Sequence, residues 1–256
     1  MILLSLFCLG SFEYFPAIGP GGGMGAGLAV ASWRNSLGGN PALTFSEENF
    51  AFVFNCIRLY SLEGVNCGLI GVKWNSSKLA TAIAVTSVGF DKYYEHDALI
   101  NFAAEPLNSF KVGIGIHSLI QRAESKTSFL PQFDAGIYWR AEHAAIAITG
   151  RRLNEPRLPD GSFLGSQFCI GGLWEPIREL KFAIDLKKYD QLEKLSIGGE
   201  FEIFPEIAIR CGVETFPLIY HGGLQVKVGV LSLEYSGQYH PEIGDSHSVS
   251  VVGEWH

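Results

Sequence analysis

Apolar and polar residues alternate along most of this chain, and this period-two pattern constrains the fold more than any other feature. From about residue 49 to the end, the alternation recurs in segments of roughly ten residues. In residues 180–187 the apolar set Leu180, Phe182, Ile184 and Leu186 alternates with Lys181, Ala183, Asp185 and Lys187. A strand points successive side chains to opposite faces, so each segment predicts a strand with one apolar and one polar face. Such segments, separated by turns, are typical of membrane-spanning barrel strands.

The composition also favours a membrane location. Hydrophobic residues make up 47% of the 256 positions and charged residues 18%, whereas soluble domains carry about 25% charged residues. No run of roughly 18 apolar residues occurs outside the N-terminus, so helical spans are not expected. A closed barrel is the other solution, because closure satisfies every backbone polar group within lipid. We therefore expect an all-β, antiparallel transmembrane β-barrel, surrounded by the lipid of a bacterial outer membrane.

Proline residues and turn signals divide the barrel region, residues 49–256, into strands. Pro176, Pro205, Pro217 and Pro241 are natural stops, because proline cannot donate a hydrogen bond to a central ladder. The resulting strands cover residues 49–60, 65–74, 79–90, 96–105, 110–122, 130–140, 143–152, 163–174, 179–189, 194–204, 206–216, 220–228, 230–240 and 246–255. This segmentation predicts about 14 strands, with 12 as the alternative; both numbers are even, as in bacterial barrels.

The predicted connections alternate in length. The longest runs from Leu153 to Ser162, whereas Phe204 to Glu206 is a tight turn. Outer-membrane barrels have short periplasmic turns and longer outer loops. The pattern predicts a barrel with both ends in the periplasm.

Two segments precede the barrel. Residues 1–19 resemble the apolar core of a secretory signal but lack a basic start and a clear cleavage site; an apolar mature N-terminus is the alternative. Residues 20–48 are predicted to be a plug inside the barrel, since the glycines at 21–23, 25 and 27 allow close backbone approach. Asn40 and Pro41 predict a turn, through a side-chain cap and a fixed φ angle. A flexible leader without a fixed place is the competing interpretation.

The polar faces of the later strands carry charges of both signs. We expect nine of them to point into the lumen: Lys181, Asp185, Lys187, Glu200, Glu202, Arg210, Glu214, Lys227 and Glu234. Cross-strand ion pairs would satisfy such groups in a partly dehydrated interior. The set is interpreted either as structural filling of the lumen or as a polar conduit or gate around the plug.

Two motifs resemble a known family. Met24, Gly25 and Gly27 begin a small-residue run, and Asn40, Pro41 and Ala42 follow it just before the first strand. Near the C-terminus, Gly244, Asp245, Ser246 and His247 open the final strand. Together they resemble the FadL-like outer-membrane barrels, in particular the PorV/PorQ branch. One departure is that Ser32-Trp33-Arg34-Asn35 stands where that family usually has acidic residues.

The resemblance implies two roles. One, typical of the PorV branch, is service in type IX protein secretion and surface attachment, with exported proteins and other secretion components as partners. The alternative is passage of small, mostly hydrophobic molecules through the wall or lumen. A soluble barrel that binds an apolar ligand is a third hypothesis; it would need apolar inward residues, whereas the expected inward set is charged.

Several classes are excluded or disfavoured by the residues. The net charge of -7 and the lack of a basic cluster argue against nucleic acid as a partner. We find no catalytic, phosphate-binding or metal-ligand motif, so neither enzymatic activity nor a cofactor or metal is expected. The cysteines Cys8, Cys56, Cys67, Cys169 and Cys211 are interpreted as small apolar residues, with a Cys56–Cys67 bridge across the first hairpin as the alternative.

Overall fold

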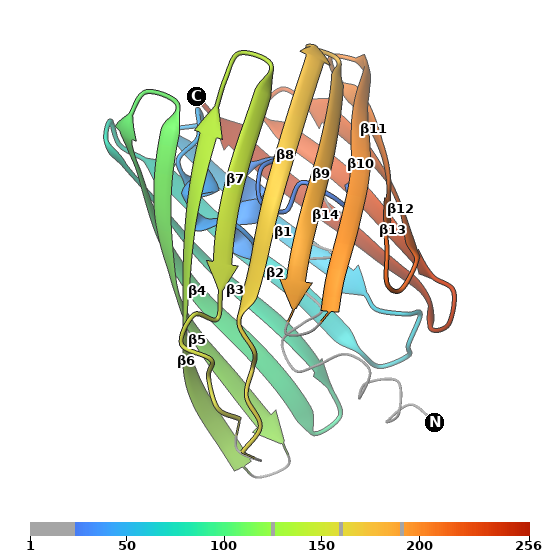
Figure 1. Cartoon of the computed structure of the whole chain (residues 1–256). Helices are drawn as coiled ribbons and strands as arrows, with labels where there is room; N and C mark the ends of the chain where they lie inside the picture. The colour runs from blue at the N-terminus through green and yellow to red at the C-terminus, as the bar shows by residue number, and fades with distance from the viewer. Residues whose placement is uncertain (1–23, 124–125, 159–160, 190–191) are drawn as a thin grey trace.

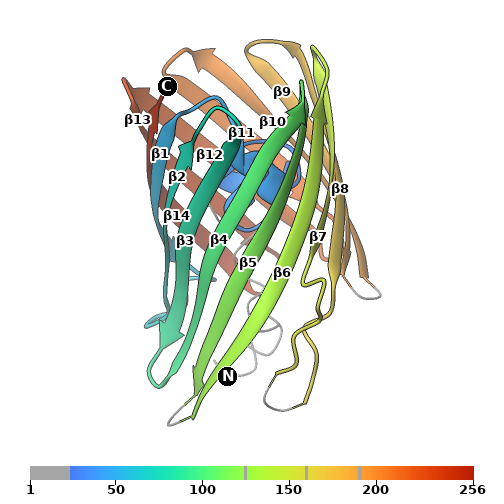
Figure 2. The same cartoon turned by 90° about the vertical axis from the view of Figure 1, so that its left-hand side faces the viewer.

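The chain forms a closed antiparallel barrel. The computed structural model describes residues 24–123, 126–158, 161–189 and 192–256, and within these ranges it contains fourteen strands. In chain order they are β1 (Phe50–Arg58), β2 (Asn66–Asn75), β3 (Leu79–Phe90), β4 (Tyr93–Leu107), β5 (Phe110–Ala123), β6 (Lys126–Arg140), β7 (Ala144–Arg151), β8 (Gln167–Ile177), β9 (Leu180–Tyr189), β10 (Leu192–Phe204), β11 (Ile207–Glu214), β12 (Ile219–Val228), β13 (Leu231–His240) and β14 (Gly244–Trp255). Each pairs with its sequence neighbours, and β1 pairs with β14 (Figure 1, Figure 2). The predicted fold class is confirmed, with 14 strands rather than 12.

Two strands depart most from the prediction, both beside the longest connection. β6 begins at Lys126, four residues before the predicted start at 130, and continues through Pro131. The carbonyl of Pro131 accepts a hydrogen bond from Asn154 at 2.7 Å, so this side of β6 faces residues 152–166 rather than a strand. The N–H that Pro131 lacks is therefore not needed for strand pairing at this position. β8 starts at Gln167 instead of 163, because Phe163 forms only an isolated bridge with Arg157.

The two ends of the barrel differ in their connections. We call the end that holds the start of β1 and the end of β14 the proximal end, and the opposite end the distal end. The two longest connections, residues 59–65 and 152–166, both lie at the distal end. The proximal connections are all short. This is the asymmetry expected for distal loops outside the cell and a proximal end in the periplasm.

The outer face is apolar and carries aromatic residues near both ends. Four tryptophans lie exposed at the proximal ends of their strands: Trp74, Trp139, Trp174 and Trp255. A second group of aromatic side chains lies exposed at the distal ends: Tyr94, Phe129, Phe168, Tyr220 and Tyr239. Two aromatic girdles around an apolar band are the pattern of a membrane barrel. An exposed apolar surface of this extent argues against the soluble barrel. None of the described helices is long and apolar enough to cross a membrane.

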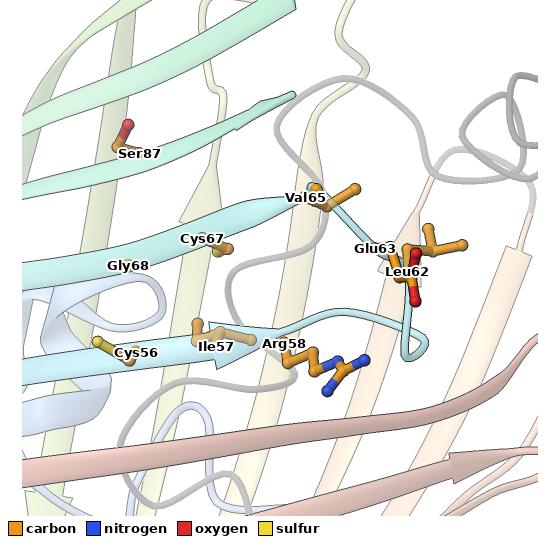
Figure 3. A pocket seen from close by; sticks show the side chains of 10 residues that line it. Cys56, Ile57, Arg58, Leu62, Glu63, Val65, Cys67, Gly68 and Ser87 are labelled. Atoms are coloured by element: carbon orange, nitrogen blue, oxygen red, sulfur yellow. The ribbon is translucent and has the colours of Figure 1, made fainter. Parts of the chain in front are cut away.

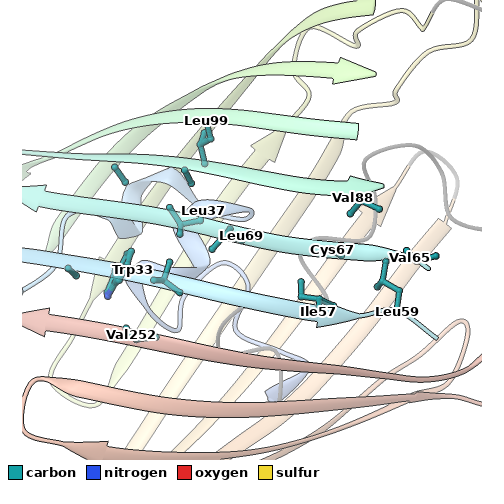
Figure 4. Packing of buried hydrophobic residues seen from close by; sticks show 14 residues of the cluster. Trp33, Leu37, Ile57, Leu59, Val65, Cys67, Leu69, Val88, Leu99 and Val252 are labelled. Atoms are coloured by element: carbon teal, nitrogen blue, oxygen red, sulfur yellow. The ribbon is translucent and has the colours of Figure 1, made fainter. Parts of the chain in front are cut away.

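The expectation of a polar inner face is wrong for much of β1–β3, whereas β4 keeps inward polar side chains such as Glu95 and Asn101. Val53, Ile57, Leu69, Val88 and Leu99 point inward and form one buried cluster. Part of this cluster packs against Trp33 and Leu37, which belong to the short helix η2 (Trp33–Leu37) inside the barrel (Figure 4). The inner wall is apolar here because it faces apolar side chains instead of water.

The alternative disulfide is also wrong. Cys56 is exposed on the outer face of β1, whereas Cys67 is buried on the inner face of β2, and both are free. In the register of this hairpin Cys56 lies opposite Gly68, and Cys67 lies opposite Ile57. Side chains on opposite faces of a sheet cannot be bridged.

The assignment of faces can be tested with two adjacent residues of β12. Leu224 is exposed on the outer face, and Gln225 points inward opposite Glu234 of β13. We expect Leu224→Arg to destabilise the barrel by about 2–4 kcal/mol near the bilayer midplane, because lipid cannot solvate the charge. Gln225→Glu should cost clearly less, because its carboxylate points into the lumen toward Arg210, whose Nη2 already donates to Gln225 Oε1 at 2.6 Å. Reversible denaturant unfolding in lipid vesicles measures both penalties; equal values would contradict the assigned faces.

Candidate functional site

Residues 24–48, which we call the plug, lie just before β1 in the chain and pack against the inner side of the barrel wall. Every residue from Met24 to Phe45 is buried or half-buried. The plug contains η2 and a second short helix, η3 (Pro41–Thr44), which packs against β4, β5 and β6. Of the predicted plug, residues 20–23 lie outside the described residues, as do the signal-like residues 1–19 and Cys8.

Inward-facing glycines form the seat of the plug. A Cβ atom on Gly198 or Gly212 would overlap the carbonyl oxygen of Met24. A Cβ on Gly136 would overlap the side chain of Asn40, and one on Gly113 would overlap the backbone of Pro41 and Ala42. The plug backbone therefore touches the wall backbone, and only residues without a side chain allow this approach.

Asn40 anchors the centre of the plug. Its Nδ2 donates to the carbonyl of Ala29 at 2.9 Å and to that of Ile137 on β6 at 3.1 Å. Its Oδ1 accepts from the N–H of Ala42 at 3.0 Å and so caps η3, with Pro41 at the first helical position. The Asn40 side chain thus links the segment at Ala29 and the start of η3 to strand β6. The turn predicted at Asn40 and Pro41 lies at this junction.

The first described turn of the plug is held by Asp185. The N–H of Leu28 donates to Asp185 Oδ2 at 2.8 Å, within a buried environment. Gly25 and Gly27 have φ angles of +64° and +88°. A Cβ at Gly25 would also meet the ring of His221 at 2.5 Å. Both backbone conformation and crowding therefore require glycine at position 25.

An ion-pair chain links the plug to the wall. Arg34 of η2 pairs with Glu234 on β13, and Glu234 lies 3.4 Å from Arg210 on β11. Arg210 Nε and Lys181 Nζ each bind Glu200 at 2.6 Å. The sequence named Arg34 only as part of a departure from the family pattern and did not reveal its partner, because Glu234 lies 200 residues further along the chain. The cation is on the plug and the acid is on the wall.

The remaining predicted charges also point inward. Lys187 binds Glu214 at 2.7 Å, and Lys194, which was not predicted, binds the same carboxylate at 3.2 Å. Glu202 lies 3.7 Å from Lys181. Lys227 is half-buried and makes no ion pair within the described residues.

Two further polar contacts lie in strands that appeared mainly apolar in sequence. His117 on β5 has Nδ1 2.9 Å from Asp97 and Nε2 3.0 Å from Asp134, so its ring lies between two carboxylates. Lys73, fully buried on β2, binds Glu48 at 2.9 Å where the plug joins β1. Burial alone would raise the pKa of the Glu48 carboxyl, but the charge of Lys73 and hydrogen bonds from Ser46 and Lys73 lower this pKa to about 2.

The final-strand signature lies apart from the plug. Gly244 opens β14 with a φ angle of +96°, and Asp245 is exposed beside the distal turn. His247 faces outward, and its Nδ1 lies 2.7 Å from the hydroxyl of Tyr235. The structure therefore does not bring this motif together with the plug motif.

Beyond the plug, a cavity of about 660 Å³ lies at the hairpin of β1 and β2 (Figure 3). Ile57, Val65 and Cys67 contribute apolar side chains from the inner cluster, and Leu62 contributes one from the loop. Cys56, Gly68 and Ser87 line it from the outer side of the wall. The charged side chains of Arg58 and Glu63 also line this cavity, which lies near the distal mouth.

The glycine seat generates a direct test. Gly136→Ala should displace Asn40 and unseat the plug, because the added Cβ overlaps the amide. We expect a higher single-channel conductance and a loss of stability on the order of 1–3 kcal/mol from overpacking. Gly172→Ala is the matched control, since its Cβ would point outward with its nearest neighbour at 3.4 Å. Identical conductance in both variants would contradict a seated, obstructing plug.

Comparisons with known proteins support the fold. No protein-family model and no curated protein matches the chain. A Pseudomonas aeruginosa FadL homologue matches in structure with a TM-score of 0.63 at 10% identity, over 94% of this chain and 98% of its own. The monoaromatic hydrocarbon channel CymD gives 0.70 at 11% identity, over 93% and 98%. The toluene transporter TodX of P. putida gives 0.65 at 8% identity, over 87% and 94%. The chain therefore has the fold of FadL-like barrels, while membership of the PorV branch stays a prediction.

Proposed function

We propose that this protein is an outer-membrane channel that admits small, mostly hydrophobic molecules from the distal side. One observation carries the proposal. The inner wall of β1–β3 remains apolar beyond the plug, where Ile57, Val65, Cys67 and Val88 continue the cluster toward the distal mouth (Figure 4). A lumen that carried only ions or polar solutes would gain nothing from such a surface.

The cavity at the β1–β2 hairpin has a suitable size and lining. Its volume of about 660 Å³ lies within the range of roughly 300–1,000 Å³ typical of small-molecule sites. The polar lining residues are Arg58, Glu63 and Ser87, and the others are apolar or glycine, which favours a ligand that is itself mainly apolar. CymD and TodX, whose fold this chain shares, are described as a hydrocarbon channel and a toluene transporter. This supports a monoaromatic hydrocarbon as the first molecule to test.

Service in type IX secretion is the second candidate, and the terminal motifs alone support it. The solved structures with this fold favour a channel instead. Deletion of the gene distinguishes the two roles in cells. Loss of surface-attached proteins, with unchanged hydrocarbon uptake, would favour the secretion role.

The channel proposal predicts a specific effect of polarity at Ile57. Ile57→Gln keeps the size of the side chain but makes it polar, whereas Ile57→Leu keeps the surface apolar. Toluene passing this surface would meet a polar amide in place of an apolar side chain, so Ile57→Gln should slow toluene uptake into proteoliposomes by about tenfold, which corresponds to about 1.4 kcal/mol. Ile57→Leu should stay near the parent rate, and ion conductance should be the same in both. Equal toluene uptake by the two variants would count against the proposal.

A further inference from the structure

The loop between β1 and β2, residues 59–65, folds toward the lumen at the distal end. Leu59 and Val65, at its two ends, are buried in the apolar inner cluster (Figure 4). Tyr60 and Leu62 are half-buried and pack against the same cluster. The loop therefore lies over the distal part of the apolar inner surface.

The side chain of Tyr60 reaches past β14 to β13. Its ring meets the ring of His240 edge to face, with 6.5 Å between the ring centroids and an interplanar angle of 87°. His240 is the buried last residue of β13, and its Nδ1 accepts a hydrogen bond from the N–H of Glu242 at 3.1 Å. The two rings, which we call the aromatic bar, thus cross the inner side of β14 at the distal end.

The Tyr60 phenol is uncharged in this position. Burial, and to a smaller extent the negative charge of Glu214 on β11, raises the pKa of Tyr60 to about 12. The aromatic bar therefore presents a neutral ring to a molecule that enters from the distal side.

The backbone conformation of Tyr60 is unfavourable for its residue type. The N–H of Leu62 donates to the carbonyl of Leu59 at 2.9 Å and closes a turn, in which Tyr60 and Ser61 have φ angles of 48° and 51°. Turns with two positive φ angles favour asparagine and glycine. The N–H of Tyr60 also donates to Ser246 Oγ on β14 at 2.9 Å. Contacts with β13 and β14, rather than local preference, therefore hold Tyr60 in place, and strain of this kind is released when such contacts open.

From this geometry we propose that Tyr60 is a specificity-determining residue, which admits flat aromatic molecules to the apolar inner surface in preference to saturated molecules of the same size. An aromatic molecule can replace His240 as the edge-to-face partner of Tyr60 while it enters, whereas a saturated ring cannot. The energy of such ring pairs corresponds to a preference of about three- to tenfold. The inference rests on the channel function proposed above and names the class of molecule that this entrance selects.

The native thiol of Cys67 reports access to this surface without requiring transport. Cys67 is free and buried, and it belongs to the inner cluster against which Tyr60 packs. The full-length protein in lipid vesicles is treated with N-phenylmaleimide or with N-cyclohexylmaleimide, which differ in the aromaticity of the ring. Peptide mass spectrometry measures the rate at which Cys67 is modified. The ratio of the two rates is compared between variants, so that partition into lipid and intrinsic reactivity cancel.

Three variants locate the selection. Tyr60→Leu should lower the ratio of the phenyl to the cyclohexyl rate by about three- to tenfold, and Tyr60→Phe should restore it, because phenylalanine keeps the ring. Tyr94→Leu is the matched control, since Tyr94 also stacks on a histidine, His96, but is exposed on the outer face. Heat-modifiable gel mobility checks that each variant is folded. An unchanged ratio in Tyr60→Leu, or an equal loss in Tyr94→Leu, would overturn the assignment.

Toluene uptake into proteoliposomes is measured separately. Uptake by the parent protein, together with a ratio that depends on Tyr60, supports both the channel and its selection. A ratio that depends on Tyr60 without any toluene uptake would reject the channel function and retain selective entry past Tyr60. Uptake with a ratio that ignores Tyr60 would retain the channel and reject the role of this residue.

Discussion

The structure depends on direct backbone contact between the plug and the barrel wall. Side chains on both bodies would keep two backbones apart, so the approach is open only where the wall carries glycine. Gly113 on β5, Gly198 on β10 and Gly212 on β11 admit the plug backbone, and Gly136 on β6 admits the side chain of Asn40. The plug is thereby held from two sides of the lumen, and the positions of Met24 and Asn40 follow from these four residues.

Charge complements this steric fit. A buried ion pair contributes specificity more reliably than stability, because desolvation offsets much of its attraction. Arg34 on the plug and Glu234 on the wall therefore act mainly to select one orientation of η2. The network extends through Arg210 to Glu200, so removing one member leaves a buried charge without its partner. Together with the apolar contacts of Trp33 and Leu37, these pairs define a single resting position.

Much of the barrel could be predicted from sequence, and less of the site. Alternation identified β9, β10, β11 and β13 because their inward residues are charged or small and their outward residues are large and apolar. It failed to reveal the apolar part of the inner surface of β1–β3, where Trp33 and Leu37 replace water. Partners such as Arg34 with Glu234 are distant in sequence, and only the closed barrel brings them together. The wall glycines also carry no local signal of their role.

The position of the plug in the chain has a consequence for the order of assembly. The plug precedes β1, yet its seat includes Gly198 on β10 and Gly212 on β11, which belong to the C-terminal part of the chain. It cannot reach its final place while the hairpin of β10 and β11 is absent. Contacts between distant parts of a chain form late, since loop closure must come first. A segment synthesised before every strand is therefore among the last to acquire its native contacts.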